Sequence, residues 1–152
     1  MRRAEREIKD RSTIEDILRR ATVCRLAVCD GQVPYVVPLS FGFDGNRLYF
    51  HSAREGRKIE ALEANPRVCF EADVDHEVVP GDIPCGWTVR YRSVIGFGQA
   101  RLLEDVAQKK RALDIILGHY GRGPFEYPEG AFDEVAVVEI EIESLTGKQS
   151  GY

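Results

Sequence analysis

VCRLAVCDGQVPYVVPLSFGFDGNRLYFHS, residues 23–52, is the stretch that decides the fold. Its runs of branched and aromatic residues over 23–29, 33–43 and 47–52 are typical of β-strands. An Asp-Gly pair separates each run from the next, and this dipeptide is a strong signal for a hairpin turn. The segment therefore predicts three antiparallel strands joined in a meander.

Two prolines, Pro34 and Pro38, interrupt the middle run. Proline has no backbone N–H to donate to a sheet, so this strand should lie at an edge, be bulged, or face a ligand at those points. Near Pro38, free backbone groups could turn toward a planar ring, but simple protection of a sheet edge is the more common explanation for such a proline.

The remaining segments add helices and further strands to the meander. Helices are expected where helix-start and helix-stop signals flank apolar stripes: after the capping box Ser12-Thr13-Ile14-Glu15, from near Arg54 to Asn65-Pro66, and from Asp105 to Gly121. Strands are expected over 67–74, 87–103 and 134–143, with Gly96 and Gly98 marking a bend in the second of these. Consecutive hairpins with glycine bends favour a small antiparallel barrel over a doubly wound sheet.

Length and composition indicate one domain over residues 1–152. A chain of 152 residues with 43% apolar and 30% charged residues can bury a core of its own. We expect residues 1–11 to be a loosely docked arm that packs on a partner, and residues 75–86, rich in proline and glycine, to be a loop.

Several classes of function are disfavoured by the sequence. It holds no apolar run of membrane-spanning length and no signal-peptide core, so we expect a cytoplasmic protein with no membrane partner. The four cysteines do not form paired CxxC blocks, so no metal site is predicted. A net charge of −4 argues against nucleic acid as a partner.

The most informative segment for chemistry is FHSAREGRK, residues 50–58. A strand that runs into a helix start, with Gly56 followed by Arg57 and Lys58, has the parts of a phosphate site. Free helix amides attract an anion, glycine allows a close approach, and the cationic side chains add charge. A basic, solvent-exposed first helical turn is the plain alternative, and spacing does not decide between the two.

Two further features bear on a site. Arg90 and Arg92 share one face of a strand, where they repel each other unless an anion or the glutamates of the last strand lie between them. His51, at a strand end, is the one histidine that we would nominate as a proton donor.

Four blocks together resemble a known family. They are residues 34–41 (PYVVPLSF), 48–58 (LYFHSAREGRK), 91–98 (YRSVIGFG) and 145–148 (LTGK). In this order they are similar to Nim-type nitroimidazole-resistance proteins of the pyridoxamine 5′-phosphate oxidase-like, FMN-binding split-barrel superfamily. The resemblance covers nearly the whole chain.

The resemblance implies a mainly β protein with flanking helices, specifically a six-stranded antiparallel split barrel that forms a homodimer and binds FMN at the subunit interface. It assigns the phosphate and ribityl groups to the segment around Gly56, the isoalloxazine wall to residues 38–41, and completion of the site to residues 92–94. The cofactor-binding residues that it implies are Pro38, Leu39, Ser40, Phe41, His51, Ser52, Ala53, Gly56, Arg57, Lys58, Arg92, Ser93 and Val94.

Three functions follow as alternatives. The first is a flavin-dependent oxidoreductase that passes electrons from NAD(P)H to a small acceptor such as a nitroaromatic, with His51 as the nominated catalytic residue. The second is a non-catalytic module that binds FMN or haem, with His51 or His119 as a haem ligand, and the third is a dimer without cofactor. The chain ends Gln149-Ser150-Gly151-Tyr152 instead of carrying the arginine-rich segment of pyridoxamine 5′-phosphate oxidases, so pyridoxamine oxidation is not expected.

Overall fold

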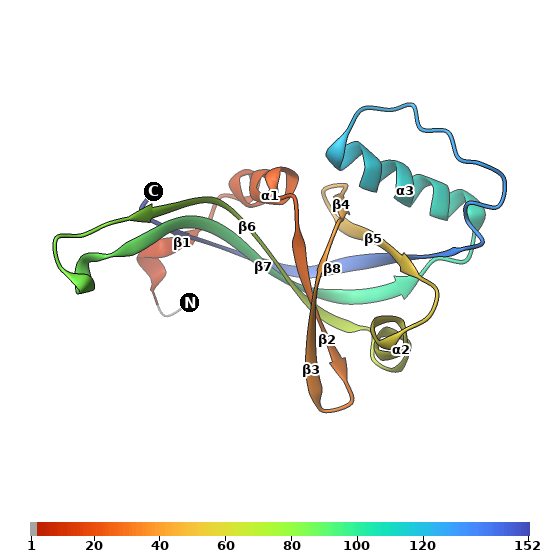
Figure 1. Ribbon diagram of the computed structural model, residues 1–152, viewed down its shortest axis with the longest axis horizontal. Coiled ribbons are helices and arrows are strands. Elements are labelled where there is room, and N and C mark those ends of the chain that lie inside the picture. Colours follow the sequence, from red (N-terminus) through yellow and green to blue (C-terminus); the bar gives the residue numbers. More distant parts are fainter. Residues whose placement is uncertain (1–2) are drawn as a thin grey trace.

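In this computed structural model, which describes residues 3–152, eight strands form one antiparallel sheet with three α-helices packed against it (Figure 1). The helices are α1 (Arg11–Arg20), α2 (Arg57–Ala64) and α3 (Val106–Tyr120). The strands are β1 (Glu7–Ile8), β2 (Cys24–Asp30), β3 (Val33–Leu39), β4 (Gly42–Phe43), β5 (Arg47–Ala53), β6 (Arg67–Val79), β7 (Thr88–Leu102) and β8 (Val135–Ser150). Two short 3-10 turns, η1 (Ala4–Arg6) and η2 (Pro84–Gly86), complete the described elements.

The strand order is β3-β2-β6-β7-β8-β5-β4, with β1 beside β8. The mainly β, antiparallel architecture with flanking helices is confirmed, and β3 is an edge strand that pairs with β2, as its prolines indicate. The prediction of six strands is wrong. The run over 33–43 forms two strands because the backbone N–H of Phe41 donates to the Tyr120 hydroxyl of α3, 2.9 Å away, instead of to a strand.

The N-terminal arm is not loosely docked, and that prediction is also corrected, with residues 1 and 2 lying outside the described part. β1 pairs with β8 in the register Ile8↔Gly147, and the Ile8 side chain is buried. A Cβ on Gly147 would lie 2.9 Å from the Ile8 Cβ, so glycine is needed there for the arm to pack this closely. The single aliphatic residue of the arm therefore anchors it to this chain's own core.

The predicted loop over 75–86 is strand in its first five residues, 75–79, and that part of the prediction is corrected. β6 continues to Val79, past a register shift between Val74 and Glu77 in which Asp75 adopts a φ of +59°. Together β6 and β7 form a long hairpin that projects away from the rest of the sheet, to the left in Figure 1. Only residues 80–87 connect the two strands. The bulge that Gly96 and Gly98 predict in β7 lies between Phe97 and Gly98.

The helix caps agree with the sequence in part. Asp105 caps α3 by accepting the Gln108 amide at 2.9 Å, and Gly121 ends that helix, as predicted. The cap of α1 is Asp10, which accepts the Thr13 amide at 2.9 Å, so the capping box at Ser12 is displaced by two residues. The helix expected from near Arg54 begins at Arg57.

Two buried clusters hold the elements together. The larger one fills the barrel between the sheet, α1 and α2, and includes Phe50, Phe70 and Val94. The smaller one lies between α3 and the outer side of β5 and β8, and includes Tyr49 and Ile116. Strand β5 thus serves both clusters, because its successive side chains point to opposite faces. None of the described helices is both long and apolar enough to cross a membrane.

Candidate functional site

The start of α2 is an open cluster of backbone donors. Gly56 occupies the N-cap with a φ of +119°, and no side chain caps the helix. The first amides of any helix lack partners within the helix, so here they face outward. A Cβ built on Gly56 would meet no atom within 4 Å, and the positive φ itself favours glycine. The backbone therefore offers an anion both donors and room.

Lys58 brings a positive charge to this helix start from a half-buried position. Its Nζ lies 5.3 Å from the centre of the Phe50 ring, over the ring face. Partial burial lowers the pKa of the Lys58 ammonium from its usual value. Among residues 3–152, no acidic side chain forms an ion pair with Lys58, so its charge is available to an external anion. Ser52 points to the same face of β5 as Phe50, because the two are separated by one residue.

Arg57 is already engaged. Its Nε lies 2.7 Å from the Asp30 Oδ2 at the end of β2, and its guanidinium stacks 4.4 Å from the centre of the Tyr35 ring on β3. Both members of the ion pair are about half exposed, at 49% and 46%. Arg57 thus ties the helix start to the β2–β3 hairpin, in a pair weak enough for a stronger anion to exchange with Asp30.

Residues 38–41 divide between surface and core. Pro38 and Ser40 are exposed at the sheet edge, and Leu39 is half-buried. Phe41 is 1% exposed, with its ring 4.6 Å from that of His119, so its side chain belongs to the core and cannot form a ligand wall. Within this segment, only residues 38–40 are placed to contact a ring.

Residues 92–94 lie elsewhere in this chain. Arg92 pairs with Asp75 at 2.8 Å and stacks on Tyr152, in the half of β7 that belongs to the projecting hairpin. Arg90 pairs with Glu77 at 3.1 Å, so both arginines find acids on β6 and not on the last strand. Val94 is fully buried, so its side chain is a core group. The helix α2 instead packs against β2, and within one chain the structure does not bring residues 92–94 to it.

His51 is exposed, but it points to the opposite face of β5 from Ser52, since the two are adjacent in a strand. His119 has its Nε2 2.7 Å from the Ala21 carbonyl oxygen and packs on Phe41, which is a structural role. Ala53 is exposed at the end of β5 and leads into the Gly56 turn.

Three residues at the helix start were missed by sequence reasoning: Asp30, Tyr35 and Phe50. The sequence indicates Asp30 only as a turn former, and Tyr35 and Phe50 fall within the blocks that carry the resemblance without being assigned a role in the site. The contacts that join them to Arg57 and Lys58 link segments far apart in the chain. An acid at the tip of a hairpin is the one local signal that could have drawn attention to Asp30.

The outer side of the sheet carries an exposed apolar face that we call the outer apolar face. Its members are in register across four strands: Val36, Ala27, Cys69 and Phe97, with Ile95 two residues further along β7. Phe97 is 52% exposed, Val36 58% and Ile95 45%. Contiguous exposed apolar surface on this scale is typical of an interaction surface.

Comparison with known proteins gives a consistent result. The profile described as pyridoxamine 5′-phosphate oxidase matches residues 10–149. A crystal structure of a proposed 5-nitroimidazole antibiotic resistance protein from Bacteroides thetaiotaomicron is 36% identical, with a TM-score of 0.85, over 94% of this chain and 86% of that one. An FAD-binding protein from Mesorhizobium loti is 26% identical, with a TM-score of 0.70, over 96% and 98% of the two chains.

Two other similarities are more limited. A flavocytochrome from Azotobacter vinelandii shares the fold, with a TM-score of 0.87 and 23% identity over 100% of this chain and 72% of that one. An uncharacterized protein from Rhizobium meliloti is 33% identical over 64 residues, a match that spans 42% of each chain.

Proposed function

Because the chain belongs to the pyridoxamine 5′-phosphate oxidase family, we propose that it is a flavoprotein that binds FMN with the phosphate at the start of α2. The observation that carries this proposal is the uncapped turn at Gly56 beside Lys58, a half-buried ammonium without an acidic partner among the described residues. A buried positive charge is costly unless it is paired, and a phosphate would supply the missing partner.

Different residues would hold the phosphate and the ring of the cofactor. Backbone N–H groups at the start of α2 and the Ser52 hydroxyl donate to the phosphate, while Lys58 and Arg57 neutralise it. The edge of β3 at residues 38–40 would hold the ring, and backbone groups near Leu39 and Ser40 would be its hydrogen-bonding partners. Bound FMN supplies the electron-carrying ring that none of these side chains can replace.

We propose that the activity is electron transfer from NAD(P)H to a small acceptor such as a nitroaromatic. Support comes from the 36% identity to the proposed 5-nitroimidazole resistance protein over most of both chains. Pro38 and Ser40 are exposed at the edge of β3, so substrates would approach a ring held there from solvent. His51 points away from Ser52, so the geometry gives it no role as proton donor in the same chain's site.

A second copy of the chain completes this site in our proposal. One chain supplies the helix start and the β3 edge, whereas residues 92–94 lie apart from both. The outer apolar face runs from β3 to β7, so it is continuous with the edge that would line the ring. A homodimer formed through this face would bury Phe97 and Ile95 and could bring the partner's β7 to the cofactor.

The test begins with the visible spectrum of the purified protein. A flavin band, followed by release of the cofactor and its identification by mass as FMN, is expected; FAD, a Soret band or no absorbance would contradict the assignment. Anaerobic addition of NADH or NADPH should then bleach the flavin, and a nitroimidazole should restore the oxidised spectrum. Flavin that stays oxidised would favour a binding module without turnover.

The residues are tested by removing their charged side chains, with removal of a distant charge as the control. Replacing both Lys58 and Arg57 with alanine should weaken FMN binding by about 2–4 kcal/mol, given about 1.5–3 kcal/mol for each charge-assisted contact with partial redundancy. Lys110→Gln, on the exposed side of α3, is the matched control and should leave the affinity unchanged. Unchanged affinity in the double variant would remove the phosphate assignment.

A further inference from the structure

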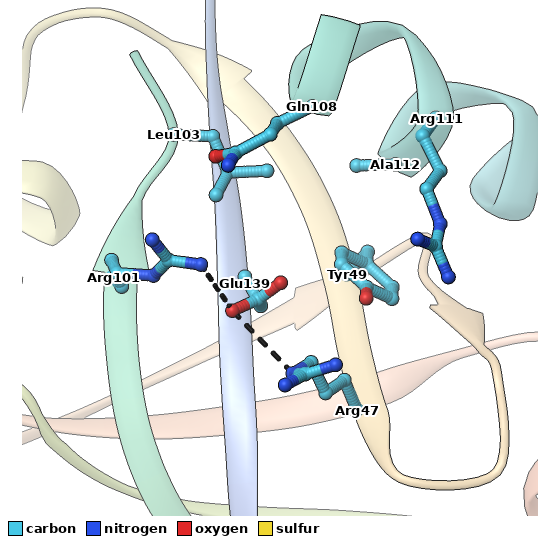
Figure 2. Close-up of a pocket in the computed structure, with 8 residues that line it drawn as sticks. All are labelled: Arg47, Tyr49, Arg101, Leu103, Gln108, Arg111, Ala112 and Glu139. Atoms are coloured by element: carbon cyan, nitrogen blue, oxygen red, sulfur yellow. Dashed lines mark hydrogen bonds and ion pairs between the residues drawn. The ribbon is translucent and has the colours of Figure 1, made fainter. Parts of the chain in front are cut away.

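A cationic pocket lies on the other side of β5 from Lys58, beside α3. Figure 2 shows its lining: Arg47, Tyr49, Arg101, Leu103, Gln108, Arg111, Ala112 and Glu139. The residues come from β5, β7, β8 and α3, and they enclose a volume of about 200 Å³. At about 30 Å³ for each water in the liquid, this is room for a polyatomic ion and a few waters.

Three arginines converge on this pocket, but only one acid lines it. Glu139, with a side chain 13% exposed, places the same oxygen, Oε1, 2.7 Å from the Arg101 Nη2 and 3.6 Å from the Arg47 Nε. Arg111 reaches in from α3 toward Tyr49 (Figure 2) and forms no ion pair among residues 3–152. The lining therefore carries three positive charges against one negative charge.

The neutral groups of the lining do not balance that excess. The Tyr49 hydroxyl donates to the Asp44 Oδ2 at 2.9 Å, and burial together with this bond raises the Tyr49 pKa to about 12, so the phenol stays neutral. Leu103 and Ala112 are buried and form an apolar floor beside the Tyr49 ring. Glu139 already lies between Arg47 and Arg101, so Arg111 is the arginine of this lining whose charge has no carboxylate beside it among the described residues.

We propose that this pocket is a binding site for a phosphate dianion, separate from the flavin site. An excess of two positive charges matches a dianion, and guanidinium groups recognise phosphate oxygens through paired hydrogen bonds. Free phosphate and a small phosphomonoester share this chemistry. The apolar floor would favour the ester, because the apolar group esterified to the phosphate would pack against Leu103 and Ala112.

The location separates this pocket from the start of α2. Tyr49 and Arg47 point to the face of β5 that α3 covers, whereas Phe50 and Ser52 point to the opposite face, where Lys58 lies. A phosphate bound at one position therefore leaves the other free.

The experiment is a titration of ¹⁵N-labelled protein with inorganic phosphate and with phenyl phosphate at constant ionic strength. Saturable shifts are expected at the Arg111 side-chain Nε–H and at the amides of Tyr49 and Leu103, distinct from any shifts at residues 56–58. Tighter binding of phenyl phosphate would identify a phosphomonoester as the ligand, and equal binding would identify free phosphate. No saturable shift at these three positions with either probe would overturn the proposal.

Variants make the test specific. Arg111→Gln should raise the dissociation constant at this pocket about tenfold, and Glu139→Gln should lower it severalfold by removing the one competing carboxylate. Arg122→Gln, an exposed residue just after α3, is the matched control and should bind as the unaltered protein does. Lys58→Gln should also leave the shifts at Tyr49 and Leu103 unchanged. If Arg111→Gln bound phosphate as tightly as the unaltered protein, with a native circular dichroism spectrum, the assignment would be wrong.

Discussion

Replacing Asp30 with asparagine should strengthen FMN binding, although Asp30 itself would not contact the cofactor. Asp30 holds the Arg57 guanidinium with an Nε–Oδ2 distance of 2.7 Å, so a phosphate at the start of α2 has to compete with this carboxylate. The amide of asparagine keeps the size of the side chain and removes the charge. Arg57 is then free to turn toward the phosphate.

The magnitude follows from the exposure of the pair. Both side chains are about half exposed, and ion pairs of this kind contribute about 0–1 kcal/mol. Asp30→Asn should therefore tighten FMN binding by up to about fivefold, since 1.4 kcal/mol corresponds to a factor of ten. Arg57→Gln loses a contact of about 1.5–3 kcal/mol but no longer has to break the pair, so a net weakening of about 1–2 kcal/mol is expected.

The assay is the quenching of FMN fluorescence on binding, measured at one fixed salt concentration because phosphate contacts are screened by salt. A double-mutant cycle is decisive: in the Arg57→Gln background, Asp30→Asn should have almost no effect. Asp82→Asn, in the exposed connection between β6 and β7, serves as the control for a general change in net charge. The reasoning is refuted if Asp30→Asn weakens binding, or if it tightens binding equally with and without Arg57.

Three further predictions concern stability and assembly. Gly96→Ala places a Cβ 2.2 Å from the Phe70 Cζ and should lower the free energy of unfolding by about 1–3 kcal/mol or more. Gly118→Ala in α3, where a Cβ would meet no atom within 4 Å, should raise the free energy of unfolding by up to about 1 kcal/mol. Urea unfolding compares the two variants, and equal effects would contradict the packing argument. The arginine partners hold the pKa of Asp75 below its ordinary value of 3.8, so its stabilising contribution is present above that pH and is lost as the pH falls through the lowered pKa. Asp75→Asn, which tolerates the positive φ, should therefore be less stable than the unaltered protein at pH 7 by up to about 1 kcal/mol. A difference in unfolding free energy that does not shrink as the pH falls below 3.8 would count against the ion pairs. Phe97→Glu should convert the proposed dimer to a monomer in light scattering, while the same change at exposed Val106, on α3, should not; a monomeric unaltered protein would remove this interface.

Local signals predicted much of the fold. The Asp-Gly pairs at residues 30–31 and 44–45 place the hairpin turns, with positive φ at Gly31 and Gly45 as such turns require. Asp105 and Gly121 delimit α3. In each of these cases the signal and the structure lie within a few residues of each other, so a single sequence is enough.

Contacts between distant segments were beyond sequence reasoning. Phe41 looked like part of a strand, but its N–H bonds to a tyrosine 79 positions later and its ring packs on His119. The Arg57–Asp30 pair joins residues 27 positions apart. No local pattern around Arg57 or Asp30 points to the other residue, since the chain has 25 acidic residues with which an exposed arginine could pair.

Successive side chains of β5 point to opposite faces of the sheet, so the strand contributes to both proposed sites, and this predicts how binding at one site affects binding at the other. Phe50 lies under Lys58 on one face, and Tyr49 forms part of the arginine pocket on the other. Because neighbouring side chains of β5 point to opposite faces of the sheet, the sites share no side chain, and distant sites without shared partners act independently. Lys58→Gln should therefore weaken binding of FMN alone, and Arg111→Gln should weaken binding of phosphate in the arginine pocket alone. The double variant should show the sum of the two effects. Strong coupling would mean that one ligand reaches both faces, which only a displacement of β5 from its pairing with β8 would allow.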